Sequence, residues 1–188
     1  FVAFSARGMA ETKMRFGLAA PEKTPWAANA HEIAHLVKLK TSGDINIQVF
    51  PGSQLGNEQD VIRQVARGRI QMGSFSNTAA SLMVPEIALL AAPYLWDDLG
   101  QADCALDSHL IPAFQQKFLD KGLIILGWSE VGYMGYAFTS PKSSLVDLKG
   151  VKMRVAPTKA SLIAASAFGT NPVVLPITEV ASALQTGL

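Results

Sequence analysis

Hydrophobic and polar positions along the chain follow two periods in turn, and these periods predict strands that alternate with helices. Period-two alternation and short apolar runs predict strands at residues 13–18, 45–49, 70–75, 123–127, 135–139, 151–155 and 171–175. Helical spacing and capping residues predict helices at residues 24–41, 57–67, 99–121, 157–168 and 178–186. Strands that alternate with helices form parallel sheets covered by helices, so the sequence predicts an α/β fold.

Capping residues mark both ends of the predicted helices. Thr24 precedes Pro25, Asn57 precedes the acidic Glu58, and Thr178 precedes the last helix, each as an N-cap. A glycine follows each helix, at positions 43, 68, 122, 169 and 187. Because parallel sheets bind ligands at the carboxyl ends of their strands, we expect the binding chemistry in the loops after residues 18, 75, 139, 155 and 175.

Composition narrows the classes of partner. Of the 188 residues, 49% are hydrophobic and 16% are charged, which excludes disorder and indicates a packed core. The net charge is +1, without a run of Lys and Arg, so no binding to nucleic acid is expected. The longest apolar stretch, residues 87–96, contains Pro93 and is shorter than the ~18 residues of a membrane span, so no direct membrane insertion is expected. The expected partner is a small molecule or a protein.

The ends of the sequence indicate processing and truncation. Residues 1–10 are typical of a signal-peptide remnant, with Gly8 and Ala10 as the cleavage site and Glu11 as the mature start; a frayed tail is the alternative. The sequence stops at Leu188, directly after a glycine typical of a helix C-cap, and we expect a fragment of a longer gene product whose C-terminal part is missing. Cys104 is the only cysteine, so no intramolecular disulfide is possible.

Residues 31–35 read His-Glu-Ile-Ala-His and fit H-E-x-x-H, which places two imidazoles on one helical face with a glutamate as general base beside zinc. Glu58 is the only later carboxylate nearby that would complete a ligand triad. However, at ~100° per residue His31 and His35 face away from the predicted buried stripe, which consists of Trp26, Ala30, Ile33 and Val37. A solvated histidine pair is favoured, and a zinc metallohydrolase is kept as the alternative function.

Arg154 has the clearest binding chemistry in the sequence. The apolar residues of the predicted strand 151–155 take one face, and Arg154 lies on the other, at the carboxyl end and just before a helix opened by Pro157. A guanidinium in this place grips a carboxylate with two parallel hydrogen bonds, and unpaired helix N–H groups add to the attraction. An ordinary surface arginine is the alternative that this strand alone leaves open.

Several short segments together form a specific series. They are Phe16-Gly17, Ser53-Gln54-Leu55-Gly56 with an acidic residue at 58, Gly68, Pro93-Tyr94-Leu95, D-L-K-G-V-K-M-R-V at residues 147–155, and E-V-A-S-A-L-Q-T-G at residues 179–187. In this order they resemble the solute-binding proteins of tripartite ATP-independent periplasmic (TRAP) transporters, the DctP type, over residues 13–188. Members of that family continue beyond this point, which agrees with the expected truncation.

The resemblance implies a bilobal, periplasmic-binding-protein-like fold with two parallel-type sheets flanked by helices, which closes over a ligand. A lobe change near residues 128–135 gives lobe I as residues 11–128 and an incomplete lobe II as residues 129–188. Arg154 matches the carboxylate-pairing arginine of the family. Less specific ligand-binding positions that the resemblance implies are Ala19, Ser76, Asn77, Pro157 and Ile177.

One position departs from the family pattern. Tyr136 stands where some members, notably those that resemble sialic-acid binders, have a second arginine. A single strong cation indicates a ligand with one buried carboxylate, such as a 2-oxo, aromatic or hydroxy acid, although Lys152 or the missing segment is an alternative source of a second cation. Trp26, Tyr133 and Tyr136 are candidates for an aromatic pocket wall, with core packing as the alternative.

These features together predict a periplasmic, extracytoplasmic solute-binding subunit that passes a small organic acid to the membrane subunits of a TRAP transporter. No catalysis and no cofactor are expected, because residues 127–132 miss the nucleophile elbow by one residue and no phosphate-binding loop is present. The alternatives are the zinc metallohydrolase and a ligand-sensing domain of the same bilobal plan, which signals to a partner.

Overall fold

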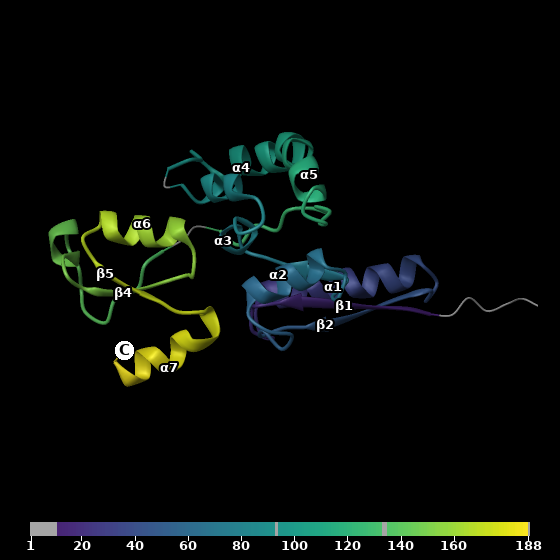
Figure 1. The fold of residues 1–188 in the computed structure, drawn as a ribbon, viewed down its shortest axis with the longest axis horizontal. Helices are drawn as coiled ribbons and strands as arrows, with labels where there is room; N and C mark the ends of the chain where they lie inside the picture. The colour runs from purple at the N-terminus through teal and green to yellow at the C-terminus, as the bar shows by residue number, and fades with distance from the viewer. Residues whose placement is uncertain (1–10, 93, 133–134, 188) are drawn as a thin grey trace, which may run out of the picture.

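Two separate parallel sheets organise the chain in the computed structural model, which describes residues 11–92, 94–132 and 135–187 (Figure 1). In the first sheet β1 (Thr12–Leu18) lies between β2 (Ile45–Phe50) and β3 (Met72–Ser74), and in the second β4 (Lys152–Val155) pairs with β5 (Asn171–Val174). The predicted α/β fold with two parallel sheets is confirmed. The predicted signal-peptide remnant at residues 1–10 and Tyr133 lie outside the described residues.

Helical elements connect the strands in the predicted order. We refer to the elements from β1 to α5 as lobe I and to those from β4 to α7 as lobe II. The helices are α1 (Pro25–Lys40), α2 (Glu58–Ala66), α3 (Asn77–Ala80), α4 (Leu99–Ala105), α5 (Ile111–Leu119), α6 (Lys159–Ala167) and α7 (Val180–Thr186), with 3-10 turns η1 (Pro85–Ala91), η3 (Leu145–Leu148) and η4 (Ile177–Glu179). Within the described ranges, no helix is both long enough and apolar enough to cross a membrane.

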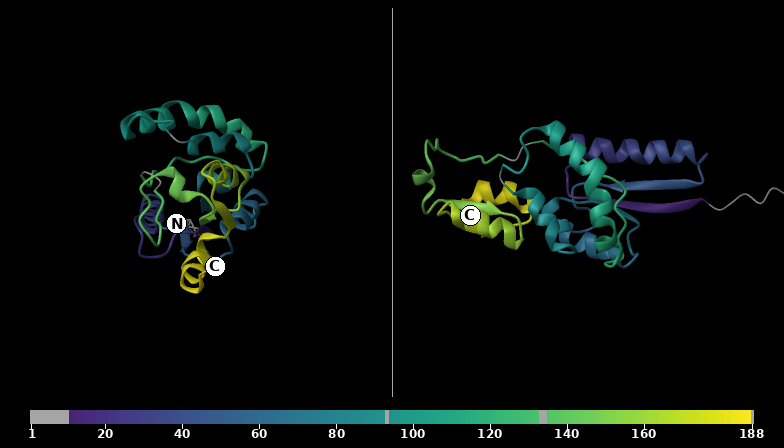
Figure 2. Two further views of the ribbon diagram at one scale, coloured as in Figure 1. Left: turned by 90° about the vertical axis from the view of Figure 1, so that its left-hand side faces the viewer. Right: turned by 90° about the horizontal axis from the view of Figure 1, so that it is seen from above.

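Helices cover both faces of the first sheet. Phe16 and Leu18 point to one face of β1 and are buried in one cluster with Ala27 of α1. Gly17 points to the other face, where α2 comes so close that a Cβ at Gly17 would lie 3.0 Å from the Cγ1 of Val61. Consequently α1 and α2 lie on opposite sides of strands β1 and β2 (Figure 2).

The second sheet has the same layered arrangement at a smaller scale. Met153 and Val155 are buried against Ala165 of α6, while α7 lies on the opposite side of β4 and β5 (Figure 1). Side chains alternate along a strand, so Arg154 points away from the face that α6 covers. Helix α6 begins at Lys159 behind the N-cap Thr158, so the prediction that Pro157 opens this helix is wrong by two residues.

The helix caps of lobe I follow the sequence closely. The Thr24 hydroxyl accepts a hydrogen bond from the Ala27 N–H at 3.3 Å, and the Asn57 side chain accepts one from the Asp60 N–H at 2.9 Å.

In lobe II, the predicted cap at Thr178 is wrong, because Thr178 lies inside the 3-10 turn that leads directly into α7. Gly187 ends α7 with a left-handed φ of 73°, as expected of a C-cap glycine.

The long helix predicted at residues 99–121 is a continuous helical run with a wide turn inside it. A π-helical turn, Leu106–Leu110, joins α4 to α5. Pro112 follows that turn; it lacks an N–H, and in a regular α-helix its ring would collide with the carbonyl group four residues earlier. The wider turn is the local solution to this conflict.

The strands predicted at residues 123–127 and 135–139 are wrong. Both stretches have irregular backbone that pairs with no strand among the residues that the structure describes. In the first stretch the side chains still alternate: Leu123 is buried, while Ile124 and Leu126 are 67% and 77% exposed. The local pattern is that of a strand, but a strand also needs a neighbour that satisfies its backbone N–H and C=O groups.

The close approach at Gly17 gives a prediction about stability. Gly17→Val inserts a branched side chain where α2 leaves no room, so the free energy of unfolding should fall by about 1–3 kcal/mol. Gly127→Val is the matched control, because a Cβ at Gly127 meets no atom within 4 Å. Chemical denaturation of both variants measures the difference, and equal losses would show that α2 does not restrict this position.

Candidate functional site

Arg154 lies at the carboxyl end of β4, and a backbone hydrogen bond orients its guanidinium. Its Nε–H donates to the carbonyl oxygen of Leu175, directly after β5, at 2.9 Å. Burial lowers the pKa of Arg154, and the nearby Glu58 carboxylate opposes this shift. An arginine stays charged at neutral pH, so the site contains a partly buried cation with a fixed orientation.

Glu58, the first residue of α2, faces Arg154 from lobe I. The backbone N–H of Ser76 donates to one carboxylate oxygen of Glu58, and the Ser76 hydroxyl donates to the other at 2.8 Å. Burial has the largest effect on the pKa of Glu58 and raises it above its ordinary value of 4.5, although the Ser76 bonds and the charge of Arg154 act in the opposite direction. The two oxygens of Glu58 are therefore acceptors in a fixed orientation.

A cleft of about 620 Å³ lies between Arg154 and the loops of lobe I. Lobe I contributes Ala19, Ala20, Pro21, Thr24, Pro25, Trp26, Asn29, Glu58, Ser76 and Thr78; the connecting segment contributes Ser129, Glu130 and Val131; lobe II contributes Arg154, Ala156 and Ile177. Among these described residues Arg154 is the only cation. Apolar walls with a few convergent polar groups are typical of a small-molecule site.

A second, much smaller pocket of about 30 Å³ lies beside the cleft. Arg154, Glu58, Ala156 and Ile177 line both spaces, and the residues that line only the smaller one are Ser53, Asn57, Gln59, Pro157, Pro176 and Thr178. Both spaces are formed by the carboxyl ends of the parallel strands together with the N-terminal turn of α2. This is the edge at which parallel sheets bind ligands.

The structure brings most of the predicted site residues together. Ala19, Trp26, Ser76, Arg154 and Ile177 line the cleft, and Pro157 and Ile177 line the smaller pocket. The Trp26 indole N–H donates to the hydroxyl of Ser74, which fixes this ring at the end of β3.

Three candidates lie elsewhere. Asn77 lines neither space, and Thr78 contributes to the cleft in its place. The Tyr136 ring stands edge-on to Phe168 with centroids 5.7 Å apart, and the Lys152 ammonium group donates to the Gly187 carbonyl oxygen at 3.4 Å. The ligand-binding role of Asn77 and Tyr136 stays a prediction.

Sequence reasoning missed Glu58, Asn29 and Ser129 as members of the site. The sequence indicates Glu58 as the acidic residue after the helix cap Asn57, as a third metal ligand and as the acidic residue after the Gln-Leu-Gly turn, and that turn is the available signal for a site residue. The Asn29 amide donates to the Ser129 hydroxyl at 3.4 Å across 100 residues of sequence. A contact between residues so far apart in sequence cannot be predicted from the local pattern of hydrophobic and polar positions.

The His-Glu-Ile-Ala-His segment lies on the solvent side of α1, as predicted. His31 and His35 are exposed, and the His31 Nε2 lies 3.0 Å from a Glu22 carboxylate oxygen. No group of three or more His, Cys, Asp or Glu side chains in the described ranges is arranged to hold a metal ion. The zinc metallohydrolase therefore has no support. Ile33 is 37% exposed, which corrects its assignment to the buried stripe.

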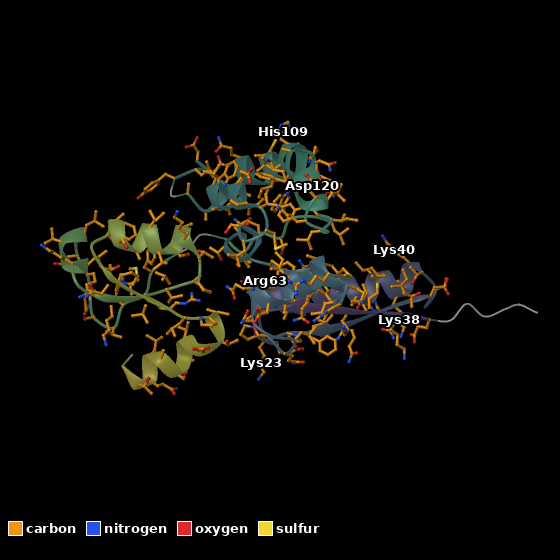
Figure 3. All side chains as sticks on the ribbon, viewed as in Figure 1. Lys23, Lys38, Lys40, Arg63, His109 and Asp120 are labelled. Atoms are coloured by element: carbon orange, nitrogen blue, oxygen red, sulfur yellow. The ribbon has the colours of Figure 1, made fainter. Side chains whose placement is uncertain are left out.

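Three basic side chains lie far from the cleft. Lys38 and Lys40 occupy the end of α1 that is furthest from β4 and β5, and His109 points outward from the π-helical turn (Figure 3). None of the three lines the cleft or the smaller pocket. The charged residues that line the cleft are Arg154, Glu58 and Glu130.

Comparisons with known proteins agree with this geometry. Residues 16–188 match the family model described as bacterial extracellular solute-binding protein, family 7 (DctP). The 2,3-diketo-L-gulonate-binding periplasmic protein YiaO of Escherichia coli (strain K12) is 32% identical over 186 residues, which cover 98% of this chain and 56% of that protein. The C4-dicarboxylate-binding periplasmic protein DctP of Rhodobacter capsulatus is 25% identical, and the match covers 100% of this chain and 57% of that protein. The chain thus spans little more than half the length of these relatives.

Solved structures with the same fold contain sugar acids. A TRAP periplasmic solute-binding protein from Xanthobacter autotrophicus with bound β-D-galacturonate superposes with a TM-score of 0.88 at 27% identity, covering 93% of this chain and 58% of that one. A second TRAP periplasmic solute-binding protein, from Citrobacter koseri with bound D-glucuronate, superposes with a TM-score of 0.87 at 27% identity. The match covers 94% of this chain and 60% of that one. The bilobal fold expected from the sequence is confirmed.

The raised pKa of Glu58 predicts a pH dependence of stability. The folded protein holds this proton more tightly than the unfolded chain does, so the ionisation of Glu58 costs stability as the pH rises above about 4.5. Glu58→Gln removes that cost. If the variant also loses a hydrogen bond to Ser76, its free energy of unfolding changes by an amount that does not depend on pH. The free energy of unfolding of the variant relative to wild type should therefore rise between pH 4.5 and pH 7, as denaturant titrations at several pH values would measure.

Glu86→Gln is the control for this experiment. A hydrogen bond from Lys117 is the largest cause that lowers the pKa of Glu86, which is an exposed carboxylate. The free energy of unfolding of Glu86→Gln relative to wild type should therefore fall as the pH rises, which is the opposite of the change expected for Glu58→Gln. If the two variants show the same pH dependence, burial does not govern the titration of Glu58.

Proposed function

The chain belongs to the family-7 bacterial extracellular solute-binding proteins (DctP), and from this premise we propose that it is the binding subunit of a TRAP-type transporter that holds a small organic acid between its two lobes. The protein binds and releases its ligand and catalyses no reaction. It acts in the periplasm and delivers the acid to the membrane subunits of the transporter.

The observation that supports the proposal most directly is the placement of Arg154. Its Nε–H donates a hydrogen bond to the carbonyl oxygen of Leu175. No hydrogen bond joins the two terminal nitrogens of Arg154 to another described residue. Arg154 lines a cleft in which the other charged lining residues are Glu58 and Glu130. A carboxylate that enters the cleft therefore pairs with Arg154, and charge-assisted bonds of this kind are short and strong.

The acidic residues of the cleft favour one chemical class of acid. A second carboxylate on the ligand would approach Glu58 or Glu130, where like charges repel. Hydroxyl groups instead donate to the fixed oxygens of Glu58, and the side chains of Asn29 and Thr78 offer further hydrogen bonds. We place polyhydroxy monocarboxylates, such as uronic or aldonic acids, ahead of C4-dicarboxylates. The sugar acids named for several relatives support this order.

The two lobes close around the ligand through the connecting segment. We place the boundary between the lobes at residues 128 and 129, so that lobe I extends over residues 11–128, and lobe II begins at residue 129 and includes the connecting residues Ser129, Glu130 and Val131. Gly132, in the left-handed region at φ +90°, lies just after this boundary, and the contact of Asn29 with Ser129 links α1 to the segment. Residues that absorb large changes of φ and ψ at the end of an element are typical of hinges.

Substitution of Arg154 tests the carboxylate anchor. Arg154→Lys keeps the charge but loses the planar fork and the bond to Leu175, so the affinity for the bound acid should fall about 10- to 100-fold. Isothermal titration of the intact protein with D-glucuronate and D-galacturonate measures the change. The matched control is Arg67→Lys, at an exposed arginine outside the cleft. An equal effect of both substitutions would reject Arg154 as the anchor.

A comparison of ligands tests the chemical class. Wild type should bind D-glucuronate or D-galacturonate at least ~10-fold more tightly than succinate, and Glu58→Gln should narrow this ratio because it removes a negative charge from the cleft. Glu86→Gln, on a surface carboxylate, should leave the ratio unchanged. Tighter binding of succinate by wild type would refute the polyhydroxy class, whereas the Arg154 result tests the anchor separately.

A further inference from the structure

Hydrogen bonds within the protein already occupy several of the side-chain donors that lobe I places along the cleft. The Thr24 hydroxyl donates to the carbonyl oxygen of Pro21 at 2.7 Å, and the Trp26 indole N–H donates to the hydroxyl of Ser74. Thr24 and Trp26 both line the cleft. A hydroxyl or an indole has a single polar hydrogen, so neither side chain has a second one for a ligand.

The hydroxyl of Ser76 determines the direction of a further hydrogen bond. Its Oγ lies 2.8 Å from Oε2 of Glu58, and an ionised carboxylate accepts hydrogen bonds but donates none, so Ser76 is the donor there. The same Oγ lies 2.7 Å from Oγ1 of Thr78, which is the usual length of an O–H···O hydrogen bond. Because the one hydroxyl hydrogen of Ser76 is directed to Glu58, Thr78 is the donor in this second contact.

The start of helix α3 fixes this arrangement. Ser76 is the N-cap of α3, and its Oγ also accepts a hydrogen bond from the Ala79 N–H at 3.2 Å. One donated and two accepted hydrogen bonds use the full capacity of the Ser76 hydroxyl. The Thr78 hydroxyl hydrogen is therefore used within lobe I, and Thr78 Oγ1 has only lone pairs to offer to another molecule.

We propose that Thr78 is a specificity-determining residue, whose Oγ1 accepts a hydrogen bond from one hydroxyl group of the bound acid. Thr78 is partly exposed and lines the cleft, and Ser76 alone separates its Oγ1 from the carboxylate of Glu58. Lobe I thus offers two neighbouring acceptors. A ligand atom that only accepts, such as a keto or ether oxygen, is disfavoured beside Thr78 because lone pairs then face lone pairs.

This role rests on the proposed function, since it specifies which polar group of the organic acid one position of the cleft selects. Arg154 of lobe II supplies the donors for the carboxylate, and the acceptors of lobe I select hydroxyl groups. A hydroxy acid satisfies both requirements. An acid of the same size without the correctly placed hydroxyl leaves Thr78 Oγ1 without a donor.

Isothermal titration of the intact protein tests the contribution of Thr78. The ligand is D-galacturonate or D-glucuronate, whichever wild type binds more tightly, at about pH 8, where Glu58 is ionised although burial raises its pKa above the ordinary value of 4.5. Thr78→Val removes the hydroxyl and keeps the branched shape, so the affinity should fall about 3- to 10-fold. Thr78→Ser is the matched control, because it retains the hydroxyl and should change the affinity by less than about 2-fold. Wild-type affinity in Thr78→Val would overturn the proposal.

Analogues of the same acid test the direction of the hydrogen bond. Among monodeoxy forms, each of which lacks one ring hydroxyl, one should bind wild type and Thr78→Val equally, because the bond to Thr78 is already lost. The corresponding deoxyfluoro form should bind wild type no better than this deoxy form, since fluorine accepts but cannot donate. The proposal is rejected if Thr78→Val weakens every analogue to the same extent, or if fluorine restores the affinity.

The same titrations separate this inference from the proposed function. If wild type binds the sugar acid and Arg154→Lys weakens that binding, the negative results described for Thr78 reject only the role of Thr78. If wild type binds neither sugar acid, the proposed ligand class and the role of Thr78 are both rejected.

Discussion

The hydrogen bond from the Nε–H of Arg154 to the carbonyl oxygen of Leu175 determines how the site is built. It is possible only because β4 and β5 run parallel in a register that places Arg154 beside Val173, so that the chain after β5 passes the guanidinium at 2.9 Å. With Nε occupied, the two terminal nitrogens of Arg154 have no hydrogen bond to another described residue. The orientation of the cation is therefore a property of the sheet as well as of its side chain.

Lobe I places a hydrogen-bond acceptor, the carboxylate of Glu58, near this cation without forming a direct ion pair with it. Glu58 faces Arg154 and influences its pKa, but its two oxygens bind Ser76, and no ion pair within 4 Å joins the two residues in the described part of the chain. A direct pair would neutralise the cation that a ligand carboxylate needs. The separation leaves the guanidinium of Arg154 and the carboxylate of Glu58 without a direct pair at the cleft, an arrangement that suits the proposed binding of an acid with hydroxyl groups.

Local chemistry made much of this arrangement predictable from the sequence. Thr24 and Asn57 cap their helices as expected, and the alternation around Arg154 correctly placed this side chain at the carboxyl end of its strand. What could not be predicted depends on partners distant in sequence. Residues 123–127 have the pattern of a strand but no neighbour to pair with, and Asn29 reaches Ser129 only because the fold brings α1 to the connecting segment. Glu58 had a local signal, the Gln-Leu-Gly turn before it, but its orientation toward Arg154 depends on how the lobes meet.

The most direct test of this account is a crystal structure of the intact protein grown with D-galacturonate or D-glucuronate. The account predicts a ligand in the cleft whose carboxylate accepts hydrogen bonds of about 2.7–2.9 Å from the terminal nitrogens of Arg154, with ligand hydroxyls directed to Glu58. A ligand whose carboxylate lies away from Arg154, or an Arg154 paired directly with Glu58 while the ligand binds elsewhere, would contradict it.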